Sequence, residues 1–194
     1  MSEAFVSLLV FVLLMVGTPG PANLLAMIGG ARLGVGPCLG FIAGLTIGKL
    51  GVNILFGVGF GLLLAEQALL LLVLKLVSAA YLAWLAVQSW TPQQSDGEDA
   101  RKGLRFREGL IVHPLNPKAW IMSLLAWTQF APDLGGFWEQ MIIVCLTFAA
   151  CQTVTHTIWC YLGALIGRAI PNSLLLTRAL VVVTVGVVAW ALLQ

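Results

Sequence analysis

The sequence predicts an all-α integral membrane protein, and its composition and its long apolar runs both indicate this. Of its 194 residues, 60% are hydrophobic and 9% are charged, whereas soluble domains are about 45–50% apolar and about 25% charged. A transmembrane helix needs about 20 apolar residues, so the chain can form six such helices joined by short loops. A net charge of +2 gives no indication of a nucleic-acid partner.

Apolar runs predict six membrane spans, and prolines at the span edges mark places where helices end. The predicted spans cover residues 4–30, 38–65, 68–90, 109–131, 137–165 and 172–194. The first apolar run follows Glu3, where a signal peptide would carry basic residues, so it is predicted to be a retained span. The one long hydrophilic connection is 91–108.

The loops differ in basic residues, and this difference predicts the orientation of the chain. The first, third and fifth predicted loops carry Arg32, Arg101, Lys102, Arg105, Arg107 and Arg168. The second and fourth loops carry the acidic residues Glu66 and Asp133 instead. Because basic loops stay on the cytoplasmic side, we expect loop 91–108 in the cytoplasm and both termini outside a cytoplasmic membrane.

The chain divides into two halves of three predicted spans each, 1–90 and 109–194, joined by the cytoplasmic loop 91–108. Because three is an odd number, the second half enters the membrane upside down relative to the first. Inverted repeats of this kind are typical of secondary transporters. The chain is also small, so a homodimer is possible in the bilayer.

Each half contains a span that proline interrupts near mid-membrane. In the first span, Thr18, Pro19, Gly20 and Pro21 stand in sequence, and such a run cannot continue a helix because proline lacks an N–H group. A helix is expected to restart at Pro21. In the fourth span, Asn116 before Pro117 is a typical helix start, with asparagine as the cap.

These two restarts predict a binding site for a carboxylate. Helix N-termini carry partial positive charge and unpaired N–H groups, and Lys118 adds a full charge beside the second restart. Paired broken helices are a sequence sign of a transporter binding site, although two proline kinks used only for packing are the alternative. The predicted site residues here are Thr18, Pro19, Gly20, Pro21, Asn23, Asn116, Pro117 and Lys118.

Four further polar residues in the spans are candidates for the same site. Lys49 lies near mid-depth, where a charge is costly and therefore indicates function, and Asn53 lies one helical turn further on. Gln152 and His156 are four residues apart and share a helix face. His156 is a candidate to bind the substrate or relay a proton, or to form an interhelical hydrogen bond, and His113 is interpreted as a partner for carbonyls freed at the break.

What the spans lack is also informative. No Asp or Glu is expected at mid-depth, which favours a neutral or acidic solute with a carboxylate over a cation carrier or ion channel, the alternative function. The spans hold no H-E-x-x-H and no G-x-S-x-G motif, so no enzyme activity, metal or cofactor is predicted. A membrane module that binds another membrane protein without transport is a further alternative.

The chain resembles the LysE/RhtB family of amino-acid exporters over essentially its whole length. The resemblance rests on the stretches Thr18–Leu25, Gly29–Gly34, Arg107–Gly109 and Leu115–Ala119, and on the number and layout of the spans. It implies export of a small amino acid or an amino-acid derivative from the bacterial cytoplasm, driven by the proton gradient. It also implies that the Pro-Gly-Pro-x-Asn and Asn-Pro-Lys motifs belong to the substrate site.

Overall fold

The computed structural model describes residues 2–59, 67–90, 104–170 and 174–192, and within these ranges the chain is helical without a strand. The first half contains α1 (Ser2–Gly17), α2 (Pro21–Leu33), α3 (Val35–Gly57) and α5 (Ala68–Val87). The second half contains α6 (Phe106–Val112), α7 (Pro117–Leu125), the π-helix η2 (Ala126–Phe130), the 3₁₀-helix η3 (Ala131–Leu134), α8 (Phe137–Ala169) and α9 (Leu174–Leu192).

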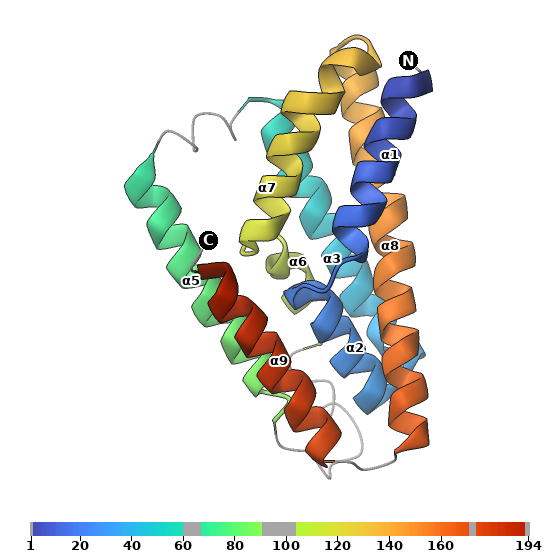
Figure 1. Ribbon diagram of the computed structural model, residues 1–194, viewed down its shortest axis with the longest axis vertical. Coiled ribbons are helices and arrows are strands. Elements are labelled where there is room, and N and C mark those ends of the chain that lie inside the picture. Colours follow the sequence, from blue (N-terminus) through green and yellow to red (C-terminus); the bar gives the residue numbers. More distant parts are fainter. Residues whose placement is uncertain (1, 60–66, 91–103, 171–173, 193–194) are drawn as a thin grey trace.

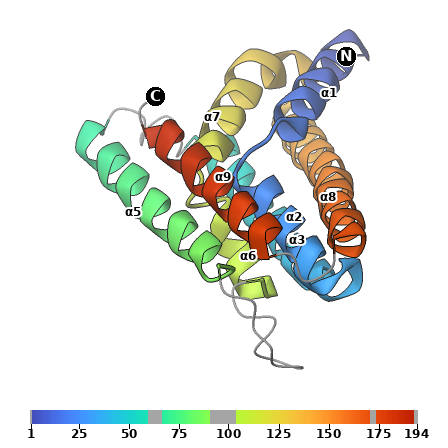
Figure 2. The same ribbon diagram turned by 60° about the horizontal axis from the view of Figure 1, so that its bottom comes forward.

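The helices run up and down along the long axis of the molecule. Figure 1 shows three units that run away from the end that carries the N-terminus, namely the pair α1–α2, then α5, and then α8. The pair α6–α7 and the helices α3 and α9 run back toward that end. Helices α5 and α9 form an antiparallel pair (Figures 1 and 2), and α9 also contacts α2. The axes of the helices are therefore compatible with a common membrane normal.

Both helix breaks expected from proline are present. Helix α1 ends at Gly17 and α2 begins at Pro21, with a bend of 56° between them. Helix α6 ends at Val112 and α7 begins at Pro117. The expected restart positions at Pro21 and Pro117 are thus the first residues of α2 and α7.

Several helix ends differ from those expected. Helix α3 begins at Val35 rather than 38, after Gly34 takes a φ of 79° that favours glycine, and it ends at Gly57. Helix α6 begins at Phe106 rather than 109, because the Arg105 N–H group donates to the Glu108 carboxylate at 3.0 Å and starts the helix. The remainder of the predicted second span and of loop 91–108 lies outside the described residues.

Length and composition identify α3 and α8 as helices able to cross a membrane on their own, and the bent pair of α1 and α2 as a third candidate span. Among the described helices, the part of α5 from Leu76 to Val87 and the part of α9 from Leu174 to Trp190 are apolar but shorter. Six spans arranged as inverted repeats therefore stay a prediction.

Two pairs of helices touch backbone to backbone through glycine. A Cβ atom at Gly30 or at Gly163 would overlap a backbone carbonyl of the facing helix in the α2–α8 pair. In the α3–α6 pair, a Cβ atom at Gly44 would overlap the Phe106 carbonyl of α6, and one at Gly109 would overlap the Phe41 carbonyl of α3. Small residues that permit such close approach are typical of helix packing in membranes, and these contacts set the positions of α2 and α6 beside their breaks.

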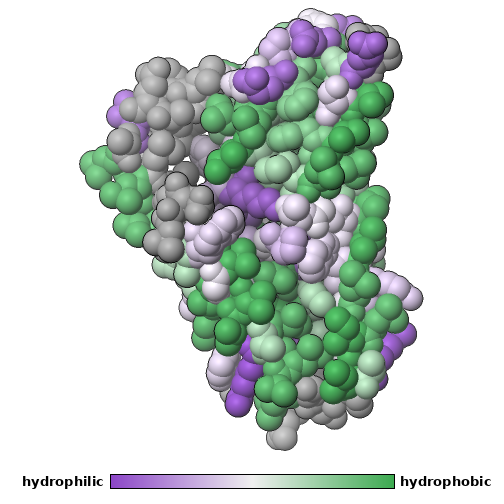
Figure 3. All heavy atoms as spheres, viewed as in Figure 1, coloured by the Kyte–Doolittle hydropathy of each residue, from purple (hydrophilic) through white to green (hydrophobic). Residues whose placement is uncertain are grey.

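Two apolar clusters lie along the long axis. The α1–α8 cluster contains Leu8, Val12, Val16, Met122, Ala126, Ala131, Leu134, Val144, Phe148 and Cys151. The α2–α3 cluster contains Ala22, Leu25, Ile28, Phe41, Leu45, Leu82, Leu85, Ala86, Leu104, Val112, Val181 and Val188. The surface in Figure 3 is hydrophobic over most of its height, with hydrophilic atoms near both ends and one hydrophilic patch at mid-height.

Replacing Gly163 by alanine is expected to lower stability, because the new Cβ overlaps the Met27 carbonyl oxygen of α2. Overpacking of this kind costs about 1–3 kcal/mol. The matched control is Gly40→Ala in α3, where nothing lies within 4 Å of the added atom and alanine favours the helix by up to about 1 kcal/mol. Thermal unfolding in detergent measures both, and an unchanged midpoint for Gly163→Ala would contradict this packing.

Candidate functional site

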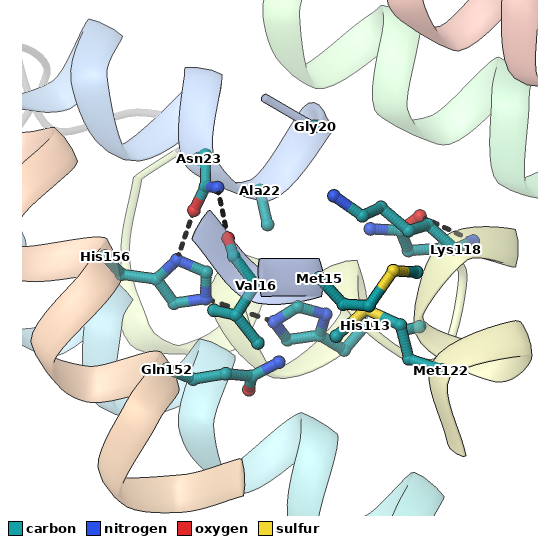
Figure 4. Close-up of a pocket in the computed structure, with 12 residues that line it drawn as sticks. Met15, Val16, Gly20, Ala22, Asn23, His113, Lys118, Met122, Gln152 and His156 are labelled. Atoms are coloured by element: carbon teal, nitrogen blue, oxygen red, sulfur yellow. Dashed lines mark hydrogen bonds between the residues drawn. The ribbon is translucent and has the colours of Figure 1, made fainter. Parts of the chain in front are cut away.

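A small cavity of about 20 Å³ lies at the two helix breaks, at the level where the apolar clusters meet. Such a volume holds about one water molecule. Figure 4 shows its lining, which comes from α1, α2, α7, α8 and the turns before α2 and α7. The lining residues are Met15, Val16, Gly20, Ala22, Asn23, His113, Asn116, Lys118, Ala119, Met122, Gln152 and His156.

The structure brings half of the predicted site residues to this cavity. Those that line it are Gly20, Asn23, Asn116, Lys118, Gln152 and His156. Thr18 lies next to it as a partner of Lys118, while Pro19, Pro21 and Pro117 belong to the two breaks. Lys49 and Asn53 are not among the residues that line it.

Lys118 bridges the two breaks. Its Nζ atom donates to the hydroxyl of Thr18 at 2.7 Å and to the Thr18 carbonyl at 3.1 Å. That carbonyl follows the C-terminus of α1, where a positive charge is favourable. The side chain is half-buried and lies against Gly20. The one cation of the lining is therefore held at the N-terminus of α2.

The two helix starts differ in the N–H groups that they offer. Asn116 caps α7, since its Oδ1 atom accepts from the Lys118 backbone N–H group at 3.1 Å. No side chain caps α2, whose N-cap is Gly20, so the N–H groups of Ala22 and Asn23 in its first turn have no intrahelical partner. The site thus presents one uncapped helix N-terminus beside Lys118, not two.

A buried chain of hydrogen bonds links α1, α2, α6 and α8. The Asn23 amide Nδ2 donates to the carbonyls of Val16 at 2.8 Å and Thr18 at 3.0 Å, both freed by the break. Its Oδ1 lies 2.8 Å from His156 Nδ1, and His156 Nε2 lies 3.3 Å from His113 Nε2. Figure 4 shows both histidine rings between α8 and the break.

His113 was expected to serve freed carbonyls, but it contacts His156 instead, and Asn23 serves those carbonyls. Sequence reasoning also missed Met15 and Met122, which form part of the apolar wall. The signal that could have identified His113 is its position beside the second break, in a chain with only two histidines.

Two polar atoms of the lining side chains have no hydrogen-bond partner among the residues that the structure describes. His113 Nδ1 and Gln152 Oε1 are buried without a hydrogen bond, on residues that are 4% and 1% exposed. Buried polar atoms are nearly always paired. Two unpaired acceptors in one cavity therefore indicate that the cavity takes a guest with hydrogen-bond donors.

Lys49 belongs to a buried cluster between α3 and α7, next to the cavity but outside its lining. Its Nζ atom donates at 2.6 Å to both the Ala119 carbonyl and the Ser123 hydroxyl, and it lies 4.4 Å from the centre of the Phe148 ring. Ser123 in turn donates to Asn53 at 2.7 Å. Lys49 and Asn53 thus connect α3 to α7 through hydrogen bonds.

The charges of the lining bear on the kind of solute. No Asp or Glu is among the lining residues, and Lys118 is cationic. Carbonyls freed at a helix break can bind cations, but those of Val16 and Thr18 already accept from Asn23 and Lys118. The site is therefore better suited to a carboxylate than to a metal cation.

Comparisons with known proteins match the chain to a family of translocators. Residues 12–193 match the family model described as LysE type translocator. A Vibrio cholerae protein named as an uncharacterized membrane protein is 27% identical over 82% of this chain and 80% of its own length. A homoserine/homoserine lactone efflux protein of Salmonella typhimurium is 29% identical over 72% of this chain and 70% of its own.

A cysteine/O-acetylserine efflux protein of Salmonella choleraesuis is likewise 29% identical, over 78% of each chain. No solved structure matches the chain.

Replacing Asn23 by leucine is expected to lower stability strongly, because the Val16 carbonyl and His156 lose their partner in the membrane interior and the Thr18 carbonyl keeps only Lys118. Each polar group left unpaired costs about 1–3 kcal/mol. The control is Thr153→Val, which removes only an exposed hydroxyl contact with Thr46, for which we expect a change within about 0.5 kcal/mol. If both variants unfold at the same temperature in detergent, the network does not hold the break.

Proposed function

The chain belongs to the LysE type translocator family, and from that premise we propose that it exports a small, neutral amino acid or amino-acid derivative. The solute would bind in the cavity between the two helix breaks and leave in exchange for protons. As a family of translocators, these proteins are membrane transporters and not enzymes.

The observation that carries this proposal is the pairing of Lys118 with the uncapped start of α2. Lys118 Nζ is held over Gly20, beside the first-turn N–H groups of Ala22 and Asn23. An ammonium group and backbone N–H groups together bind a carboxylate well, because both are donors and both carry positive charge. On arrival the carboxylate would replace Thr18 as a partner of Lys118.

The remaining walls favour a neutral solute. Met15, Val16, Ala22 and Met122 give the cavity an apolar side, and methionine adapts to side chains of different shape. Lys118 is the one Lys or Arg in the lining, so a second carboxylate would lack a charged partner. Homoserine, cysteine and O-acetylserine, which appear in the names of the relatives, are neutral amino acids.

The cavity must widen to hold an amino acid, since its 20 Å³ fits about one water molecule. The α1–α8 cluster and the α2–α3 cluster close it toward the two ends of the molecule. Alternating access would open one end at a time.

We further propose six spans in two inverted repeats, 1–90 and 109–194. One half of each broken span packs through glycine against the second span of the other repeat, as α2 does against α8 and α6 against α3. Exchanging the two repeats would not exchange these two interfaces, because α2 corresponds to α7 and α1 to α6. The support for the repeat arrangement is that a proline break interrupts the first span of each half, as expected for such transporters.

Replacing Lys118 by methionine is expected to reduce export at least about tenfold, since a hydrogen bond to a charged group contributes about 1.5–3 kcal/mol. Cells that express the protein would receive dipeptides of homoserine, cysteine and other neutral amino acids. Mass spectrometry of the medium measures the amino acids that leave.

The control for this variant is Ile121→Val on the exposed side of α7, which should export normally at equal membrane content. Unchanged export by Lys118→Met would remove Lys118 from the site. Cation flux that is independent of amino acids would favour the alternative, a cation carrier.

The proposed orientation places both termini outside the cytoplasmic membrane, since the basic loops face the cytoplasm. Alkaline phosphatase joined after Gln194 should therefore be active, and green fluorescent protein at the same place should be dark. The opposite pair of signals would reverse the orientation.

A further inference from the structure

The hydrogen bonds at the break give the histidine pair a fixed direction of donation. Asn23 uses its Nδ2 group on two carbonyls, so only its Oδ1 faces His156 Nδ1, and Nδ1 must carry the proton. In a neutral ring, His156 Nε2 is then an acceptor, and His113 Nε2 donates to it across 3.3 Å. When both rings are neutral, His113 Nδ1 therefore keeps a bare lone pair.

This lone pair is one of the two unpaired acceptors of the cavity. Gln152 Oε1 is the other, and both residues line the same space as Lys118. Figure 4 shows the side chains of His113 and Gln152 side by side on the wall of the pocket, with Lys118 further along it. The cavity thus has hydrogen-bond donors at Lys118 and the start of α2, and acceptors at His113 and Gln152.

The groups that face His113 are cationic or neutral. Its titratable neighbours are His156 on α8, Lys118 on α7 and Lys49 on α3, while α1 and α2 contribute only neutral side chains to the lining. An ammonium group that enters the cavity therefore finds no carboxylate, and the two unpaired acceptors are what it can bind.

We propose that His113 Nδ1 and Gln152 Oε1 form the subsite for the α-ammonium group of the exported amino acid, and that the coupling proton competes for the same Nδ1 lone pair. The inference rests on the proposed function and deepens it. The carboxylate binds Lys118 and the start of α2, and the ammonium group donates to His113 and Gln152.

Competition for one lone pair prevents the proton and the amino acid from binding together, and it gives obligatory exchange when the carrier turns only with one of the two bound. A proton on Nδ1 turns His113 into an imidazolium, which has no acceptor left and repels an ammonium group. The amino acid binds from the cytoplasm only after Nδ1 has released its proton there. After the amino acid leaves on the outside, Nδ1 takes up a proton from water, so one proton enters for each zwitterion that leaves.

The test is amino-acid exchange in proteoliposomes with the same pH on both sides, using labelled L-homoserine, L-cysteine and O-acetyl-L-serine. For the intact protein, acidification should raise the half-saturating concentration by up to about tenfold per pH unit with an unchanged maximal rate, as competition by protons requires. The deaminated analogues 4-hydroxybutyrate and 3-mercaptopropionate should compete at least tenfold more weakly than the parent amino acids.

Three variants separate the roles of the acceptors. His113→Asn keeps an acceptor oxygen near the position of Nδ1 but binds no proton, so exchange should persist within threefold and lose its pH dependence. His113→Gln reaches the position of Nε2 and leaves no acceptor at Nδ1, so it should raise the half-saturating concentration at least tenfold. Gln152→Leu should do the same. Thr157→Val, whose hydroxyl bonds only its own helix, is the control.

Each result bears on one of the two proposals. If the intact protein exchanges none of the three amino acids, the proposed function fails, and this inference fails with it. If it exchanges one but His113→Asn keeps the pH dependence of the intact protein, the proton binds elsewhere. Analogues that compete as well as the amino acids would overturn the ammonium subsite. A purely structural histidine would make Asn and Gln equally harmful, with lowered unfolding temperatures.

Discussion

The interruption of the first helix by Pro19, Gly20 and Pro21 is the constraint on which the rest of the site depends. In a membrane interior the carbonyls that it frees must find partners within the protein. Asn23 and Lys118 provide them, on Val16 and Thr18. The hydrogen bonds that pair these carbonyls therefore bring together Asn23, which orients the two histidines, and Lys118, which lies beside the start of α2.

The proline pattern predicted both helix restarts to the residue, at Pro21 and Pro117, because proline acts locally through its missing N–H group and its fixed φ. It also predicted that the breaks meet, and Lys118 with Thr18 joins them. What the pattern could not predict is which N–H groups stay unpaired. Asn116, which predicts the start of α7, also accepts a hydrogen bond from the Lys118 backbone N–H group, so that group is not left for a ligand.

Depth along a span gives the height of a residue but not the direction in which it points. Lys49 was predicted to belong to the site from its depth, yet its Nζ atom binds Ala119 and Ser123 of α7 and the side chain does not line the cavity. His113, Met15 and Met122 reach the cavity only because α1, α6 and α7 converge there. That convergence depends on contacts between distant segments, such as the glycine interface of α3 and α6, and no local periodicity encodes it.

The glycine interfaces also divide the molecule mechanically. Backbones in direct contact lose the most dispersion energy when they part, so α2 with α8 and α3 with α6 resist separation. The other halves of the two broken spans, α1 and α7, are held by side chains instead, α1 in the α1–α8 cluster and α7 through Lys49, and both lie toward the end that carries the N-terminus (Figure 1). A rearrangement at the joints 18–20 and 113–116 would therefore break side-chain contacts of α1 and α7 before it broke the backbone contacts of the two glycine interfaces.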